Sequence, residues 1–119
     1  MNSIFKILSS NEWDEAKMTG IIPRCTADEE NNCVHVNEYQ DLEVVCGSFY
    51  KPSDYPVALE FAPDSYAGDL KWLEKTTEKP WREGQLSIDN LLADLVLNIY
   101  SFEHQQTDIG IVFSLQGES

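Results

Sequence analysis

The chain has 119 residues, with 21 Asp and Glu against 8 Lys and Arg, and a formal net charge of −13. A chain of this length buries about two-thirds of its unfolded surface, so we expect one domain over residues 1–119. Scattered cations in an acidic chain argue against binding to nucleic acid or to an anionic membrane. The apolar runs are far shorter than the ~20 residues of a membrane span, and the first eight residues do not resemble a signal peptide. These features predict a soluble, cytoplasmic protein whose charge favours a basic partner.

The cysteine content indicates a reducing compartment. Cys25, Cys33 and Cys46 form no C-x-x-C pair, and only His35 and His104 could join them in a metal site. The spacing of zinc ligands is absent, so no metal is expected. We predict three reduced thiols that behave mainly as small buried hydrophobes.

The first 32 residues predict a strand and a helix followed by a loop. Residues 4–8 are an apolar strand, and Ser9 with Glu12 has the spacing of a capping box. Gly20 is a plausible stop for the helix that this box begins. Residues 21–32 end in a run of acidic and amide side chains, which predicts a solvated loop.

A second strand and helix follow. Residues 33–36 predict a short strand whose alternation places His35 on the face opposite the two valines. Asn37 and Gln40 repeat the capping-box spacing, and Gly47 predicts the end of the second helix.

The middle of the chain contains the clearest strand pattern. Residues 55–61 alternate apolar side chains on one face, which predicts a strand. Residues 62–86 are rich in turn formers, and only residues 70–74 among them are strand-like. A short turn of helix is expected over residues 88–93.

The last part of the chain predicts a hairpin. Residues 95–102 and 109–115 are two strand patterns, joined by a polar turn over residues 103–108. Strands and helices mix without regular β-α-β spacing. The expected fold is therefore α+β, with a mixed, mainly antiparallel sheet and flanking helices.

His35 is the strongest single candidate for chemistry. Its imidazole could hydrogen-bond a ligand or act as a general base near neutral pH. The alternative is a histidine that a neighbouring backbone group satisfies. The chain contains neither a glycine-rich phosphate loop nor a G-x-S-x-G nucleophile turn, and its acidic residues are too many for any one pair to be informative.

Aromatic residues in the loop-rich middle third suggest an interface. Trp72 and Trp81, with Arg82 and Glu83 beside the latter, have the composition of a binding hot spot if the two indoles are exposed. The alternative is that both indoles cover the core.

The order of these features resembles an uncharacterised bacterial family, domain of unknown function 952, over residues 4–100. Residues 103–119 lie beyond the resemblance and are interpreted as an added C-terminal strand. The residues that carry the resemblance are the apolar strand at 4–8, Glu12 and Trp13, the succession Val34, His35, Val36 and Asn37, then Gln40, Leu70, Lys71, Trp72, Glu74, Pro80 and Gly84.

The resemblance implies a fold similar to the ADP-ribosyltransferases, with a cleft shaped for NAD. His35 would then lie nearest the nicotinamide ribose, with Asn37 beside it, and Glu83 could replace the glutamate that stabilises the oxocarbenium-like centre. The sequence departs from the family where a serine becomes Asn37. It also departs in the Pro-His-Leu-Tyr-Gly segment, which here is residues 80–84 and lacks the His and the Tyr.

Two functions follow from these observations. The first is a non-catalytic, acidic protein-binding module without a cofactor, an inhibitor or regulator of an enzyme with a basic surface. In size and acidity the chain is similar to small pathogen effectors that act in the host cytosol and inhibit effectors which deamidate or crosslink ubiquitin. The alternative is an NAD-consuming enzyme, an ADP-ribosyltransferase or NAD hydrolase, that uses His35 and Glu83. Self-association into a homo-oligomer is compatible with both.

Overall fold

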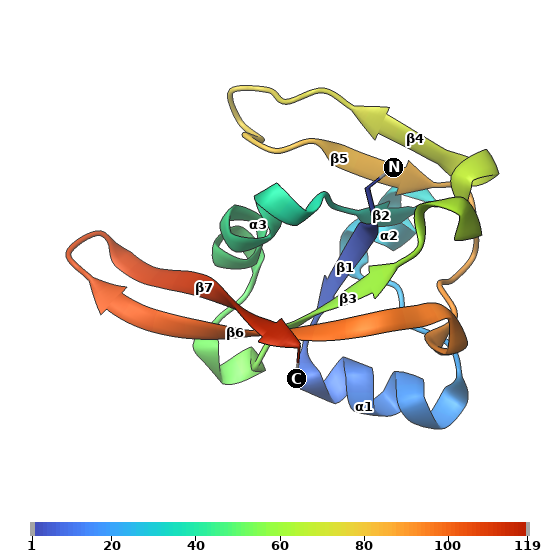
Figure 1. The fold of residues 1–119 in the computed structure, drawn as a ribbon. Helices are drawn as coiled ribbons and strands as arrows, with labels where there is room; N and C mark the ends of the chain where they lie inside the picture. The colour runs from blue at the N-terminus through green and yellow to red at the C-terminus, as the bar shows by residue number, and fades with distance from the viewer. Residues whose placement is uncertain (1, 119) are drawn as a thin grey trace.

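Two antiparallel sheets organise the fold (Figure 1). The computed structural model describes residues 2–118. The larger sheet has the order β1-β3-β6-β7, with β1 at Ile4–Leu8, β3 at Val57–Phe61, β6 at Val96–Thr107 and β7 at Gly110–Glu118. The smaller sheet has the order β2-β5-β4, with β2 at Val34–Val36, β5 at Glu83–Leu86 and β4 at Leu70–Leu73. These antiparallel sheets with their helices confirm the predicted α+β class.

An isolated bridge between Phe5 and Asn37 joins β1 of the larger sheet to the residue that follows β2. The Phe5 amide donates to the Asn37 carbonyl at 3.0 Å, and the Asn37 amide donates to the Phe5 carbonyl at 2.8 Å. All five residues of β1, including Lys6, are buried. The site described below lies at this seam between the sheets.

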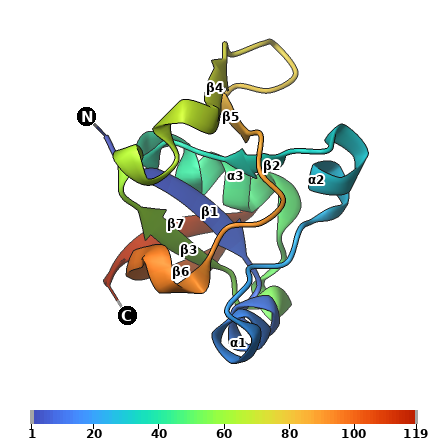
Figure 2. The ribbon, with the colours of Figure 1, turned by 90° about the vertical axis from the view of Figure 1, so that its right-hand side faces the viewer.

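The first helix forms as predicted. The Glu12 amide donates to the Ser9 hydroxyl at 3.1 Å, and the Ser9 amide donates to the Glu12 carboxylate at 2.9 Å, which completes the capping box of α1 (Ser10–Thr19). Gly20 ends the helix with a φ of 81°, in the left-handed region that glycine enters freely. Figure 2 shows α1 at the end of the molecule farthest from the loop that joins β4 and β5.

The second predicted helix begins later and ends later than its pattern indicates. Asn37 caps no helix, because its backbone is committed to the bridge with Phe5. A 3-10 turn over Tyr39–Asp41 leads into α3 (Leu42–Phe49), which continues through Gly47. Burial of one apolar face of α3 outweighs the ~1 kcal/mol that a glycine costs inside a helix.

Three other predictions were wrong. The expected solvated loop contains the helix α2 (Thr26–Asn31), and β5 lies within the turn-rich residues 62–86. No α-helix forms over residues 88–93, because the backbone groups of Leu91 and Ala93 bond to Ile22 and Gly20 instead of to a helical neighbour. The chain bends at residues 88 and 89, and a 3-10 turn begins at Ala93.

Two hydrophobic clusters pack on the larger sheet. The alternation predicted for β3 is confirmed, since Leu59 and Phe61 belong to one cluster and Ala58 to the other. The second cluster also holds Trp81 and the buried residues of α3. No helix within residues 2–118 is long and apolar enough to cross a membrane.

The predicted hairpin is confirmed, with longer strands and a shorter turn. β6 pairs with β7 from Phe102 opposite Leu115 to Thr107 opposite Gly110, so the turn is only Asp108 and Ile109. The outer part of this hairpin extends beyond the body of the molecule (Figure 1). We call residues 102–115 the arm.

Candidate functional site

A cleft of about 740 Å³ lies at the seam between the sheets. It brings together four residues that the sequence singled out: His35, Asn37, Trp81 and Glu83. Elements far apart in the sequence supply its lining, namely β1, α2, β2, α3 with Tyr50, and the segment leading into β5.

The register of the smaller sheet explains why Glu83 reaches His35. His35 of β2 lies directly opposite Gln85 of β5. Glu83 is two residues before Gln85 and therefore shares its face. The Glu83 Oε2 atom lies 3.6 Å from His35 Nε2. This contact between Glu83 and His35 is the one that the NAD-consuming alternative requires.

Gly84, between these two residues, faces the other way and permits close packing. A Cβ atom at this position would lie 2.7 Å from Val36 Cγ2 and 2.9 Å from the Trp72 ring. Only glycine lets the indole approach the sheet this closely. Along residues 81–84, Trp81 and Glu83 therefore line the cleft, whereas Arg82 lies on the other side, over Trp72 of β4.

Asp28 is the centre of a buried polar network behind His35. Its side chain is fully buried and its two oxygens accept four hydrogen bonds. Oδ1 accepts from the His35 backbone amide at 2.9 Å and from His35 Nδ1 at 2.7 Å. Oδ2 accepts from Lys6 Nζ at 2.9 Å and from the Cys25 amide at 3.2 Å. Four bonds fill the lone-pair sites of a carboxylate.

This network fixes the orientation of the imidazole. Burial by itself raises the pKa of Asp28, but the hydrogen bond from His35 and the charge of Lys6 outweigh burial and hold that pKa well below its ordinary value. Because an ionised carboxylate only accepts, His35 Nδ1 carries the proton of their shared hydrogen bond. Nε2 is left directed toward Glu83 and the cleft.

Glu83 is held in its charged form by its neighbours. Burial alone raises its pKa, but hydrogen bonds from Lys79 and Gln85, both at 3.1 Å, lower that pKa below the usual glutamate value. The neighbouring thiol is affected in the opposite direction, since burial and the charges of Asp28 and Glu83 raise the pKa of Cys33. Cys33 therefore stays a thiol, which does not favour a nucleophilic role.

The cleft is lined by both charged and aromatic side chains. Three of the chain's eight Lys and Arg residues, Lys6, Arg24 and Lys79, line it. Phe49, Tyr50 and Trp81 line it as well. Such a surface can bind a ligand that has both an anionic or hydroxylated part and a flat apolar part.

The two tryptophans of the predicted hot spot lie in different surroundings. Trp81 is only 6% exposed and belongs to the second cluster, so of the two alternatives for this indole the one in which it covers the core is correct. Trp72 is partly buried, and the Arg82 guanidinium lies 5.2 Å from the centre of its ring. Arg82 also forms an ion pair with Glu38 at 3.4 Å.

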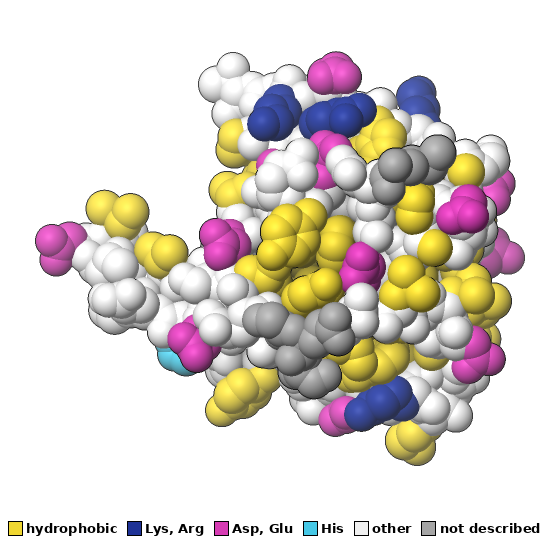
Figure 3. Space-filling view, in the orientation of Figure 1, with side chains coloured by type: hydrophobic (Ala, Val, Ile, Leu, Met, Phe, Trp, Pro, Cys, Tyr) yellow, Lys and Arg dark blue, Asp and Glu magenta, His cyan; other side chains and the backbone are white. Residues whose placement is uncertain are grey.

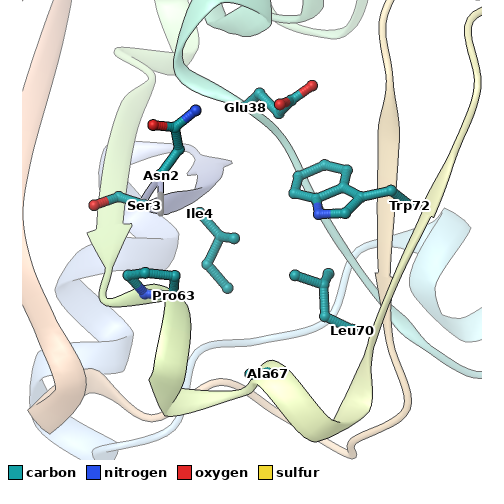
Figure 4. Close-up of a pocket in the computed structure, with 8 residues that line it drawn as sticks. All are labelled: Asn2, Ser3, Ile4, Glu38, Pro63, Ala67, Leu70 and Trp72. Carbon is teal, nitrogen blue, oxygen red and sulfur yellow. The ribbon is translucent and has the colours of Figure 1, made fainter.

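Trp72 lines a second, smaller pocket of about 370 Å³ (Figure 4). Figure 4 shows Trp72 and Leu70 on one side of this pocket, Asn2, Ser3 and Pro63 on the other, and Ile4 between them. The four residues proposed for partner binding therefore do not form one continuous surface.

Sequence reasoning missed the two residues that hold His35 in place. Asp28 lies in an acidic run that has the composition of a solvated loop, and Lys6 is the single charge in an otherwise apolar strand. An isolated Lys in a strand buried on both faces is itself a signal, because a buried ammonium requires a carboxylate partner. Among residues 2–118, no group of three His, Cys, Asp or Glu side chains could hold a metal ion.

Comparison with solved structures identifies a protein of the same fold class. Neither the models of known protein families nor the curated proteins gave a match to this chain. The crystal structure of protein CC0527 from Caulobacter crescentus matches with a TM-score of 0.72 and 24% sequence identity, over 92% of each chain. Its solution NMR structure matches with a TM-score of 0.70, also at 24% identity, over 93% of this chain and 91% of that one. At this identity the likeness establishes the α+β fold alone.

Proposed function

We propose that this chain is a non-catalytic, acidic protein-binding module that inhibits or regulates a partner enzyme with a basic surface. The observation that carries the proposal is the arm. Ile109 at its turn is 92% exposed, and Ile111 and Val112 are 40% and 41% exposed. Apolar side chains on a projecting hairpin are typical of a protein contact rather than of a folding core.

The charge around the arm supports a basic partner. No Lys or Arg occurs after Arg82, whereas Glu and Asp continue to the end of the chain. Figure 3 shows acidic and hydrophobic side chains along the arm, with no Lys or Arg on it in this view. An acidic field of this kind accelerates encounter with a basic protein in a salt-dependent manner.

The cleft network also supports a binding function, because its polar groups bind one another. Asp28 has four internal donors, and Glu83 binds Lys79 and Gln85 while facing His35. Networks of this kind hold a strand and a helix in one arrangement. In this interpretation they stiffen the body that presents the arm.

The test begins with capture of a partner and depends on reconstitution with the purified pair. Titration calorimetry compares the wild-type chain with Ile109→Ser and, as a matched control, Met18→Ser. Met18 is 87% exposed on α1, so neither change disturbs the core. We expect Ile109→Ser to weaken binding by about tenfold or more, and Met18→Ser by less than about twofold. Equal affinities for the two variants, or no reconstituted partner at all, would refute the proposal.

A second candidate function rests on a specific contact in the cleft. The 3.6 Å approach of Glu83 to His35 meets the requirement of the NAD-consuming alternative. In that role the Glu83 carboxylate would stabilise a cation-like ribose while nicotinamide leaves, and water or a protein nucleophile would take the ADP-ribose. The resemblance to domain of unknown function 952, and through it to the ADP-ribosyltransferase-like fold, supports this reading.

Nicotinamide release separates the two functions. The chain is incubated with millimolar NAD, and free nicotinamide is measured for the wild type, His35→Ala and Glu83→Gln. Release that both variants abolish would support the enzyme. Absence of NAD binding by calorimetry at millimolar concentration would reject the enzyme and favour the binding module.

A further inference from the structure

We propose that the open edge of β6 in the arm pairs with an extended, basic segment of the partner protein. The added strand would continue the line of β3 and make a third strand in the arm. This inference rests on the proposed function and specifies how the arm binds.

The edge is open because β3 ends before the arm begins. The pairing of β3 with β6 stops at Val57 opposite Ser101. β6 continues to Thr107, and its remaining residues have β7 on one side. Within the described chain no strand lies on their other side. An open edge of this length is a template for another strand.

One contact of β7 shows which residues of β6 direct their backbone N–H and C=O groups toward the open side. The Leu115 amide donates to the Glu43 carboxylate of α3 at 2.7 Å, so it points away from β6. Leu115 lies opposite Phe102, and in an antiparallel ladder alternate pairs direct their N–H and C=O groups outward. His104 and Gln106, two and four residues after Phe102, therefore direct their backbone groups toward the open side.

The outer edge of β7 is less accessible than this edge of β6. α3 covers β7 at Leu115, and Phe113 is only 4% exposed. His104 and Gln106, in contrast, are exposed. The accessible template is therefore on β6.

The composition of the arm indicates the chemistry of its occupant. Lys and Pro, the residues that usually protect an edge from pairing, are absent from residues 102–115. The charged residues there are Glu103 and Asp108, both acidic. They favour a segment with Lys or Arg, whereas a second copy would bring together two chains that each carry −13. Backbone pairing supplies the affinity, and the basic side chains supply the selectivity.

Proline substitution tests the edge without breaking the hairpin. Gln106→Pro removes an outward N–H that β7 does not use, and Gln106→Ala controls for loss of the side chain. The probe is a capped nine-residue peptide that alternates Lys with Thr and Val, titrated into isotope-labelled protein and followed by NMR. A peptide with Glu in place of Lys controls for charge, and amide spectra first establish that each variant is folded.

We expect the Lys peptide to shift the amide signals of His104 and Gln106 and to slow their hydrogen exchange. Affinity should fall by about tenfold or more in Gln106→Pro and for the Glu peptide, and by less than about twofold in Gln106→Ala. Unchanged His104 and Gln106 signals at millimolar peptide, or equal binding by the two variants, would overturn the proposal. A wild-type dimer in sedimentation that Gln106→Pro dissociates would also overturn it, since a second copy then occupies the edge.

The outcome separates this inference from the proposed function. A reconstituted partner that loses affinity with Ile109→Ser but binds Gln106→Pro and Gln106→Ala equally overturns the edge pairing and leaves the binding function intact. Peptide pairing at His104 and Gln106 without any protein partner supports the edge and overturns the function.

Discussion

Replacing Lys6 by Met tests the buried network directly. Met keeps the length and the apolar stem of Lys but leaves the Asp28 carboxylate without the Lys6 ammonium group, which lies 2.9 Å away. The two side chains are 7% and 0% exposed, so water cannot replace the lost charge. Breaking a buried pair by removing one partner typically costs about 3–5 kcal/mol. We expect a loss of unfolding free energy in that range.

Three further variants separate charge pairing from simple damage to the core. Lys17→Met removes the cation of the Lys17–Asp14 pair, whose side chains are 55% and 66% exposed, and should cost at most ~1 kcal/mol. Asp28→Asn keeps an acceptor but removes the charge. The double variant Lys6→Met/Asp28→Asn leaves no unpaired charge, so its destabilisation should be smaller than the sum of the single losses by about 2 kcal/mol.

Urea unfolding followed by circular dichroism at neutral pH measures all four variants against the wild type. The comparison uses the midpoint together with the slope, so that a change in the unfolded state is recognised. Lys6→Met within about 1 kcal/mol of the wild type, or single losses that simply add in the double variant, would refute the reasoning.

Three further predictions follow from the packing and the charge of the same region. The pKa of Asp28 is lower in the folded than in the unfolded chain, so the unfolded chain binds the proton first as pH falls. The free energy of unfolding should therefore decline below about pH 5. Urea titrations of Asp28→Asn should show a smaller decline than those of the wild type. Gly84→Ala should lower the free energy of unfolding by about 1–3 kcal/mol, because the added Cβ would lie 2.7 Å from Val36. At Gly47 an added Cβ would have no neighbouring atom within 4 Å, so Gly47→Ala should leave the free energy of unfolding equal or higher. Trp81→Ala should lower unfolding free energy by about 3–5 kcal/mol, and a thermal midpoint equal to that of the wild type would contradict the buried position of this side chain.

Local signals in the sequence were sufficient for much of the fold. The capping box of Ser9 and Glu12, the stop at Gly20, and the alternation of β3 are interactions within a few residues, so the chain encodes them directly. The C-terminal hairpin is equally local, because its strands are adjacent and its turn is short. The α+β class followed from these elements.

Signals that depend on distant partners were misleading by themselves. Asn37 and Gln40 have the spacing of a capping box, but the backbone of Asn37 bonds to Phe5, which lies more than thirty residues earlier. Asp28 belongs to a run with the composition of a solvated loop, yet Lys6 and His35 bury it. In each case a long-range contact replaced the structure that the local pattern favours, as tertiary interactions commonly do.

The candidate site illustrates the same division. The sequence singles out His35 and Glu83, and it leaves open whether Trp81 is exposed or covers the core. Only the register of β2 against β5 decided that Glu83 faces His35, and only packing against α3 decided that Trp81 is buried. The sequence of a strand determines which of its residues share a face. Which side chains lie opposite that face is determined by pairing with another strand, because side chains on neighbouring strands meet through register and not through sequence distance.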